Sequence, residues 1–409
     1  MRDMWDFIII GGGASGMAAA IAAAKSGDKV LLLEKSPALG RKISASGNGR
    51  CNLMNIGKPV YYGDSAFAQE VLKHYPKEKL LRFWKDLGLL LSTEDDGRIY
   101  PGTYHSSSVI DAMKTALNQH HVDIRLQTAV NTAEKKTNVF EACTSREIYR
   151  SARMLIATGG PAYPKLGGTS SGFRLLSCFG HHIIPAVPSL CPICTDARSI
   201  SGLSGIRVRC GLTLVNPSRQ PVIHETGELL FTEYGISGIC AMQCARFIDR
   251  EGFTVRVDFL EPYSIPQSDA VTLLISRRSR SSGLSPEHIL NGILVPRLSY
   301  AVFKQSGVPT RNRTAKDITD KEIAEVAARL TSYTLQVTGV RGFDYAQVTA
   351  GGVSCSEFHS STLESDYVPG LHAAGELLNV DGDCGGYNLM FAFASGILAG
   401  LNGREETFR

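Results

Sequence analysis

The stretch DFIIIGGGASG, at residues 6–16, decides the fold. It opens with a short β-branched apolar run, which is typical of a buried parallel strand, and passes directly into the pattern G-x-G-x-x-G. An Ala-rich, helix-forming segment covers residues 17–25, and a second apolar run at residues 29–33 ends at Glu34. A strand, a glycine turn, a helix, a strand and a terminal acid in this order predict the βαβ unit of a dinucleotide-binding sheet.

Each glycine of the pattern has a separate expected role. Gly11 allows a tight turn, Gly13 lets the backbone approach a pyrophosphate, and Gly16 lets the helix pack closely on the strand. The N-terminus of the helix offers free N–H groups and a partial positive charge to the diphosphate. Glu34 stands where a carboxylate accepts both hydroxyls of an adenosine ribose, which disfavours a 2′-phosphate. The expected dinucleotide is therefore FAD or NAD rather than NADP.

A further apolar strand, at residues 153–160, ends in Ala-Thr-Gly-Gly. Ligands of doubly wound sheets bind at the carboxyl ends of the parallel strands. We therefore expect Thr158, Gly159 and Gly160 to lie beside the cofactor.

The segment 370–401 is the third part of the chain that we expect to contact the same ligand. A short strand leads to a Gly-Glu pair, and after a loop a Gly-Gly pair precedes an apolar helix. A helix N-terminus reached in this way can face the pyrimidine edge of a flavin, where its dipole stabilises negative charge. The residues expected to contact the cofactor here are Gly375, Glu376, Asp381, Gly385, Gly386, Tyr387, Asn388 and Leu389. Three returns to one site fit the extended FAD better than NAD.

The run GRKISASGNGRCN, at residues 40–52, gathers cations and small polar side chains between glycines. Arg41, Lys42 and Arg50 bring three positive charges to the side where a diphosphate would lie. The cofactor contacts expected in this run are Arg41, Lys42, Asn48, Gly49, Arg50, Cys51 and Asn52. Further expected contacts are Ala14, Ser15, Lys35 and Val130.

Taken together, these segments resemble one family. The glycines of 11–16 with Glu34, the run 40–52, the segments 157–160 and 349–353 (TAGGV), and the C-terminal motifs look like a bacterial FAD flavoprotein family. That family includes 3-dehydro-bile-acid Δ4,6-reductase and aminoacetone-oxidase-like proteins. The resemblance covers essentially the whole chain. It implies one non-covalent FAD and an α/β fold, in which a Rossmann-like FAD-binding domain is interrupted by a β-barrel-like domain and a small helical domain.

The domain boundaries follow from these anchors. Alternating strand-like runs occur at 207–215 and 253–259, and prolines at 262, 266, 286 and 296 punctuate a region with short helices expected at 270–276, 288–293 and 321–330. The expected division is 1–190 plus 341–409 for the FAD-binding domain, 191–262 plus 331–340 for the β-barrel-like domain, and 263–330 for the helical domain.

Composition limits the classes of function and the compartment. The 409 residues are 43% hydrophobic and carry a net charge of only +4, so no nucleic-acid partner is expected. Ten cysteines are too sparse for a disulfide-stapled secreted module, and we expect a cytoplasmic protein. Glycines break the apolar stretch 7–24, so no membrane insertion is expected.

Other motifs give weaker evidence about function. Cys191-Pro-Ile-Cys194 could be a redox dithiol, but its proline-rich context favours buried small side chains, and no metal site is expected. A second G-x-G-x-x-G after a strand is absent from the sequence, so NADH or NADPH would be a transient donor, or the substrate itself the reductant. Candidate polar groups near the flavin are Tyr104, His105, Arg341, His372 and Tyr387, and none is identified as catalytic.

Three classes of function remain open, of which the first two act on a small-molecule substrate. The first, suggested by the resemblance, is an oxidoreductase in which reduced flavin N5 delivers hydride to an activated C=C bond of a 3-oxo-Δ4 or Δ4,6 bile-acid-like steroid. The second is an aminoacetone-type amine oxidase that uses oxygen. The third is a non-enzymatic flavoprotein that binds RNA or protein, which the modest charge weakens.

Overall fold

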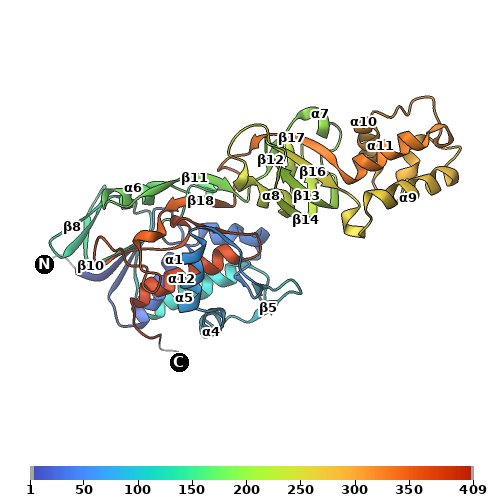
Figure 1. Cartoon of the computed structure of the whole chain (residues 1–409). Helices are drawn as coiled ribbons and strands as arrows, with labels where there is room; N and C mark the ends of the chain where they lie inside the picture. The colour runs from blue at the N-terminus through green and yellow to red at the C-terminus, as the bar shows by residue number, and fades with distance from the viewer. Residues whose placement is uncertain (1–3, 407–409) are drawn as a thin grey trace. The chain divides into compact units, whose positions relative to one another are not determined.

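The computed structural model describes residues 4–406, which divide into two compact units (Figure 1). Of the described residues, the first unit contains 4–188 and 346–406, and the second is the continuous segment Ser189–Tyr345. The helical and barrel segments expected as separate domains thus fall in one compact unit.

The first unit is built on a sheet with the strand order β7-β2-β1-β10-β9-β8, and β19 pairs with β10. The strands are β1 (Met4–Ile10), β2 (Val30–Leu33), β7 (Asp123–Arg125), β8 (Val130–Lys136), β9 (Val139–Thr144), β10 (Ile148–Ile156) and β19 (Leu371–Ala373). The pairs among β7, β2, β1, β10 and β19 are parallel, whereas β8 and β9 are antiparallel. Apart from Met4 at the start of β1, the apolar residues of β1 and β2 are buried, as a parallel sheet covered on both faces requires.

Two helices of this unit, α1 (Ala14–Lys25) and α12 (Tyr387–Leu401), pack directly on one another. A Cβ on Gly396 would lie 2.2 Å from the Ser15 carbonyl oxygen, and one on Gly400 would lie 2.3 Å from that of Ala19. Because both contacts advance four residues along each helix, the helices run parallel. In this register α12 begins eight residues before α1, so its N-terminus extends about 12 Å further along the common axis.

Smaller elements complete the first unit. Its other helices are α2 (Arg41–Ala45), α3 (Ser65–His74), α4 (Lys77–Asp86), α5 (Ser106–Gln119) and α6 (Ser171–Cys178). The small sheets are β3 (Met54–Asn55) with β6 (Arg98–Pro101) and β5 (Leu91–Thr93), β4 (Tyr61–Gly63) with β20 (Val380–Gly382), and β11 (Ile183–Ser189) with β18 (Val348–Val353).

The second unit contains a closed barrel with the strand order β12-β15-β14-β13-β16-β17, which confirms the expected barrel. The strands are β12 (Ile193–Thr195), β13 (Arg207–Val215), β14 (Pro221–Phe231), β15 (Gly235–Ser237), β16 (Thr254–Asp258) and β17 (Tyr333–Val340). Alternate residues of β13 and β16, among them Leu212, Leu214, Val255 and Val257, are fully buried and fill its interior. Helices α7 (Ala197–Ile200) and α8 (Ile239–Cys244) belong to the same unit.

The helical segment of the second unit differs in detail from the sequence expectation. It contains α9 (Gln267–Arg280), α10 (Pro296–Ser306) and α11 (Asp320–Thr331). The helix expected at 288–293 is instead a 3₁₀ turn over Pro286–Leu290, and α10 was not expected. Pro296 looked like a break, but proline suits the first turn of a helix because the N–H it lacks would have no partner there.

The apolar stretch 7–24 is divided between β1 and α1 by the glycine turn. Within residues 4–406 no helix combines the length and the apolar character needed to cross a membrane.

Candidate cofactor and active site

The turn between β1 and α1 is shaped by three glycines. Gly11 has a φ of +115°, and a Cβ there would lie 2.4 Å from the Ala157 carbonyl oxygen. A Cβ on Gly16 would lie 1.8 Å from the Gly11 carbonyl oxygen, so only glycine allows this close packing of helix and strand. Around Gly13 no atom lies within 4 Å of a Cβ position, which leaves one side of the turn open. An extended ligand can therefore approach the backbone at this point.

The N-terminus of α1 has no capping side chain and no acid in its first turn. Its first N–H groups, at Ala14 and Ser15, are those that an intrahelical bond cannot satisfy. Uncapped N–H groups and the helix dipole together favour an anion such as a diphosphate.

Glu34 lies at the carboxyl end of β2, next to this turn. Its carboxylate accepts hydrogen bonds from the N–H groups of Gly12 and Ser36, each at 2.7 Å. The Thr128 N–H donates to the Glu34 carbonyl oxygen (2.8 Å), which brings the chain just before Val130 to the same edge of the sheet. Lys35 is exposed beside Glu34.

The end of β10 and the segment after β19 meet this turn. Gly159 has a φ of +69°, and a Cβ on Gly160 would lie 2.3 Å from Thr349 Oγ1 of β18. A Cβ on Gly375 would lie 2.5 Å from Ser15 Oγ in the first turn of α1. The structure thus brings three separate glycine-rich segments to one place, and Thr158 leads into the second of them.

The three cations of the run 40–52 have different surroundings. Lys42 Nζ forms an ion pair with Glu376 Oε2 at 2.5 Å, and the other oxygen of Glu376 accepts from the Thr349 N–H (3.0 Å). Arg41 donates to the Lys165 carbonyl oxygen (2.8 Å). Arg50 is exposed and has no ion pair or side-chain hydrogen bond among the described residues.

The N-terminus of α12 also lacks a capping side chain and a first-turn acid. A Cβ on Gly386 would lie 2.6 Å from Asn52 Oδ1, so the Asn52 amide lies at this helix end. Asn52 Oδ1 is buried and has no hydrogen-bond partner among residues 4–406. A buried acceptor of this kind needs a donor, which the ring N–H of a flavin would supply.

The loop before α12 is held by its own first turn. The Asn388 side chain donates to the Gly382 carbonyl oxygen and accepts from the Gly382 N–H, both at 2.8 Å. The Tyr61 hydroxyl donates to the Tyr387 carbonyl oxygen (2.9 Å). Gly385 and Leu389 flank this arrangement in the same segment.

Two predicted cofactor residues are buried. Cys51 has a left-handed backbone (φ +60°), and burial raises the pKa of its thiol to about 12, so it stays protonated at neutral pH. Asp381 lies in β20 and is 1% exposed.

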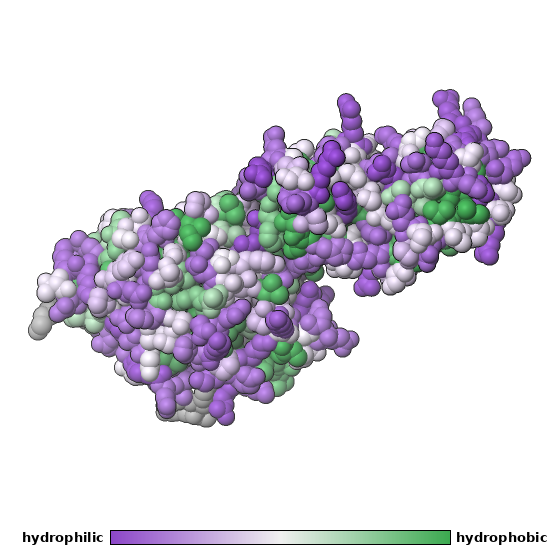
Figure 2. Space-filling view, in the orientation of Figure 1, coloured by the Kyte–Doolittle hydropathy of each residue, from purple (hydrophilic) through white to green (hydrophobic). Residues whose placement is uncertain are grey.

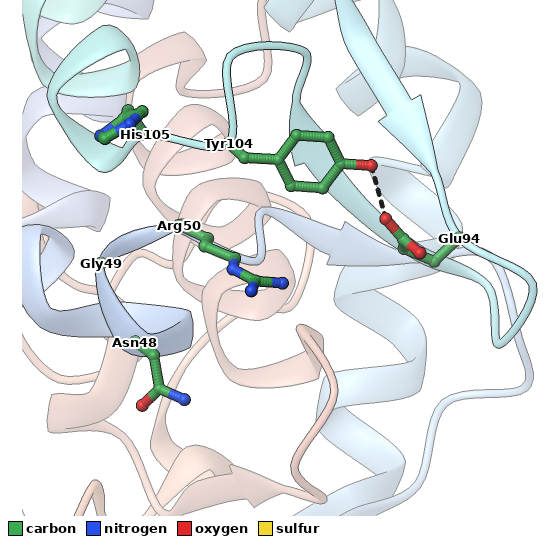
Figure 3. Close-up of a pocket in the computed structure, with 6 residues that line it drawn as sticks. All are labelled: Asn48, Gly49, Arg50, Glu94, Tyr104 and His105. Atoms are coloured by element: carbon green, nitrogen blue, oxygen red, sulfur yellow. Dashed lines mark hydrogen bonds between the residues drawn. The ribbon is translucent and has the colours of Figure 1, made fainter.

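A polar cavity of about 670 Å³ adjoins the run 40–52 (Figure 3). It is lined by Asn48, Gly49, Arg50, Glu94, Tyr104 and His105. The Tyr104 hydroxyl donates to the Glu94 carboxylate and lies 2.6 Å from Ser92 Oγ, while its ring stacks on Tyr100. In Figure 3 the Arg50 guanidinium and the Tyr104 phenol extend into the same space. Two polar groups expected near the flavin, Tyr104 and His105, therefore share one pocket.

Glu94 and Ser92 were not found from the sequence. They lie in and just after β5, and the β5–β6 hairpin brings them to Tyr104. Their only local signal is the turn sequence Glu-Asp-Asp-Gly at 94–97, which predicts a hairpin but no chemistry.

His372 and Arg341 have other surroundings. His372 is fully buried in β19, with Nδ1 3.0 Å from the Thr362 carbonyl oxygen and its ring against Phe7. Burial lowers its pKa to about 4, so it is a neutral core residue rather than a polar group of the site. Arg341, in the second unit, lies between the rings of Tyr234 and Tyr345.

The Cys-x-x-Cys pair has the surroundings of structural cysteines. Cys191 is buried and donates to the Gly342 carbonyl oxygen, and burial raises the pKa of its thiol to about 11. Burial also raises the pKa of Cys194. Among residues 4–406 no group of three His, Cys, Asp or Glu side chains is arranged to hold a metal ion.

Two uncapped helix N-termini that are offset by about 12 Å along the helix axis, with a carboxylate at one end and an unpartnered buried acceptor at the other, define a Rossmann-type FAD-binding protein. Residues 5–402 match the family described as HI0933-like protein Rossmann domain, and the chain belongs to that family. The family resemblance inferred from the sequence is thereby confirmed.

Full-length relatives of two kinds are similar to the chain. The 3-dehydro-bile acid delta(4,6)-reductase of Clostridium scindens is 35% identical over 408 residues, which cover 97% of this chain and 98% of the relative. A ribosomal RNA dihydrouridine synthase of Escherichia coli is 29% identical over 404 residues, which cover 96% of each chain. Among solved structures, 3-ketosteroid delta1-dehydrogenase of Sterolibacterium denitrificans has the same fold, with a TM-score of 0.50, 14% identity, and coverage of 98% of this chain and 99% of that one. The chain is a flavin-dependent oxidoreductase.

Proposed function

We propose that the protein reduces a C=C bond conjugated with a carbonyl group, and that its preferred substrate is a 3-oxo-Δ4 or Δ4,6 bile-acid-like steroid. The observation that carries the proposal is the polar cavity at Tyr104, because its wall belongs to the same run of chain as Asn52 at the N-terminus of α12. A substrate bound there would lie next to the flavin end of the cofactor site.

The names of both kinds of relative describe one chemistry. A Δ4,6 steroid with a 3-oxo group and a uridine ring each contain a C=C bond conjugated with a carbonyl, and a delta(4,6)-reductase and a dihydrouridine synthase each add hydrogen across such a bond. When bound, FAD supplies the hydride for this addition. The remaining requirement is a proton for the neighbouring carbon.

Tyr104 is the residue that we assign to proton donation. It is the hydroxyl-bearing residue that lines the cavity, and Glu94 and Ser92 fix the direction of its phenol. In this scheme the phenol O–H turns from Glu94 to the α-carbon, gives its proton to that carbon and is reprotonated from solvent, to which the cavity is open. Asn52 and the N-terminus of α12 would hold the ring of the cofactor, and the uncapped N-terminus of α1 would hold its diphosphate.

The electron donor is part of the same proposal. The structure has one glycine-rich βαβ turn among the described residues, and FAD accounts for it. NADH or NADPH is therefore proposed as a transient donor that reduces FAD and leaves before the steroid binds.

Uridine in RNA is a second candidate substrate for the same chemistry, and the charge of the helical segment favours it. Residues 263–330 contain ten Lys and Arg but six Asp and Glu, so their net charge of +4 equals that of the whole chain. Arg280, Arg311 and Lys316 are exposed there, and Figure 2 shows many hydrophilic residues on the visible face of this segment. Such a surface attracts phosphates.

An anaerobic experiment tests the proposal. NADH or NADPH should bleach the flavin of the holoenzyme, and a 3-oxo-Δ4 steroid acid should restore its colour and gain two hydrogens by mass spectrometry. If the steroid leaves the flavin reduced while a uridine-containing ribosomal RNA fragment reoxidises it and yields dihydrouridine, the second candidate is correct. If aminoacetone bleaches the flavin and oxygen then yields peroxide, the protein is an amine oxidase and both proposals are wrong.

A further inference from the structure

One charged side chain in the lining of the cavity at Tyr104 has no partner of opposite charge in the described part of the chain. Glu94, the acid in its lining, accepts the hydrogen bond from the Tyr104 hydroxyl. Arg50, the cation in its lining, has no ion pair or side-chain hydrogen bond within residues 4–406. Other arginines of the first unit are engaged, for example Arg98 with Asp96 (3.3 Å) and Arg153 with Asp28 (2.5 Å). The cavity therefore offers an unpaired positive charge to a ligand.

The backbone around Arg50 is held in a conformation that costs energy. Asn48 (φ +56°) and Cys51 (φ +60°) are both left-handed without being glycine. The turn is closed by hydrogen bonds from the Arg50 N–H to the Gly47 carbonyl oxygen (3.2 Å) and from the Cys51 N–H to that of Ser46 (3.0 Å). Left-handed non-glycine residues persist where the surroundings enforce them, and they gather at ligand sites. This turn fixes the point from which the Arg50 side chain extends into the cavity.

The same turn connects the cavity to the cofactor site. Cys51 is buried directly after Arg50, and Asn52 follows with its unpartnered oxygen at the N-terminus of α12. Lys42 and Arg41 of the same run are engaged elsewhere, by Glu376 and by the Lys165 carbonyl oxygen. Arg50 is thus the cation of this run that is available to a second ligand.

We propose that this cavity binds an anionic group of the substrate, a carboxylate, and that Arg50 is the residue that recognises it. This inference rests on the proposed reduction of a conjugated C=C bond and adds the residue that selects a substrate with a carboxylate over an uncharged one. The guanidinium offers two parallel N–H donors to the two carboxylate oxygens, a geometry that lysine cannot reproduce. His105 and Asn48 line the cavity as additional polar groups.

The test compares a 3-oxo-Δ4 steroid acid with its uncharged methyl ester on the FAD-loaded enzyme. Dissociation constants are measured by equilibrium dialysis against the oxidised protein, and kcat and KM are measured with the reduced donor. The wild type should bind the acid about tenfold or more tightly than the ester, as expected for a charge-assisted hydrogen-bonded pair. Arg50→Gln should remove that preference by weakening the acid alone, with KM raised and kcat little changed. Arg50→Lys should retain part of it.

The controls separate this inference from its alternatives. Arg146→Gln changes an exposed arginine in the turn between β9 and β10 and should leave the preference intact. If Arg50→Gln still prefers the acid over the ester, the inference is wrong. If the variant binds the acid and the ester with wild-type affinities but loses FAD on dilution, the inference is also wrong, and Arg50 serves the cofactor diphosphate. If a uridine oligonucleotide shows the Arg50 dependence and the acid does not, the anion is a phosphate and the carboxylate proposal is overturned.

Failure of the proposed reduction can be distinguished from failure of the binding inference. When the wild type binds the acid through Arg50 but reduces neither acid nor ester, the proposed function fails and the binding inference stands. When both compounds are reduced with equal efficiency by the wild type and by Arg50→Gln, the proposed function stands and the binding inference fails.

Discussion

Lys42 and Glu376 are 334 positions apart in the chain, yet their side chains form an ion pair of 2.5 Å at the junction of the glycine-rich segments. Both side chains are largely shielded, with exposed fractions of 28% and 20%. Lys42→Met would leave the Glu376 carboxylate with only the Thr349 N–H. We expect this variant to lose about 1–3 kcal/mol of unfolding free energy, measured by denaturant titration. The double variant Lys42→Met/Glu376→Gln should recover part of the loss; a double variant as unstable as the sum of the singles would argue against a direct interaction.

Glu34 gives a prediction about cofactor affinity. Glu34→Ala removes the carboxylate that accepts hydrogen bonds from the Gly12 and Ser36 N–H groups and that we expect to bind the ribose of FAD. FAD affinity should fall by about 1–3 kcal/mol, seen as flavin release when the protein is diluted and filtered. Glu325→Gln, an exposed change in α11, is the matched control. Equal flavin retention in both variants would exclude this role for Glu34.

The contact between α1 and α12 predicts that residue 396 must have no side chain larger than that of glycine. Gly396→Val would place a side chain against the Ser15 carbonyl oxygen, where a Cβ alone would stand at 2.2 Å. The helices must separate, so we expect a loss of about 1–3 kcal/mol or more and a lower FAD content, because the two helix ends shift apart. Thermal unfolding and flavin absorbance measure both effects. Gly283→Ala, with no atom within 4 Å of its Cβ position, should change neither.

Tyr104 gives the kinetic prediction. Tyr104→Phe keeps the ring that stacks on Tyr100 but removes the proton that we assign to the α-carbon. Turnover should fall by about 10²- to 10⁴-fold, while steroid binding to the oxidised enzyme and bleaching by the nicotinamide donor remain close to wild type. Unchanged turnover would move the proton donation to His105 or to water.

His372 gives a pH dependence of stability. Burial holds its folded-state pKa at about 4, below the 6.5 of an unfolded histidine. Above pH 6.5 both states are neutral; as the pH falls below 6.5 the unfolded chain binds a proton that the folded chain does not, so stability declines until about pH 4. Between pH 7 and pH 5 this costs about 2 kcal/mol. His372→Phe should flatten that part of the unfolding profile, whereas the exposed His74→Gln should not.

The parts of the site that could be predicted are those encoded in one short stretch of sequence. Residues 6–34 contain strand, turn, helix, strand and acid in order, and β1, α1 and β2 follow them closely. Two strands of the barrel, β13 and β16, were also predictable from alternation, whereas the barrel itself was implied by the family resemblance. The different surroundings of the cations at 41, 42 and 50 were not predictable, because Arg41 and Lys42 find their partners, the Lys165 carbonyl oxygen and Glu376, in distant parts of the chain.

The remaining parts depend on contacts between distant segments. Nothing near Ser92 or Glu94 marks them as partners of Tyr104, since the β5–β6 hairpin creates that contact. The relation between α1 and α12 is set by glycines 381 positions apart from their partner residues, which no local pattern reveals. His372 looked available as a polar group, but its strand is short and fully buried.

The pairing of α1 with α12 has a consequence for the order in which the chain folds as it is synthesised. The second unit is one continuous segment and leaves the ribosome complete while α12 is still unmade. The βαβ unit at the start of the chain must therefore wait, with the surface of α1 that receives Gly396 and Gly400 uncovered, until residues 387–401 arrive. Domains usually fold in the order of synthesis, whereas here we expect the later-made unit to fold first and flavin capture to be the final step.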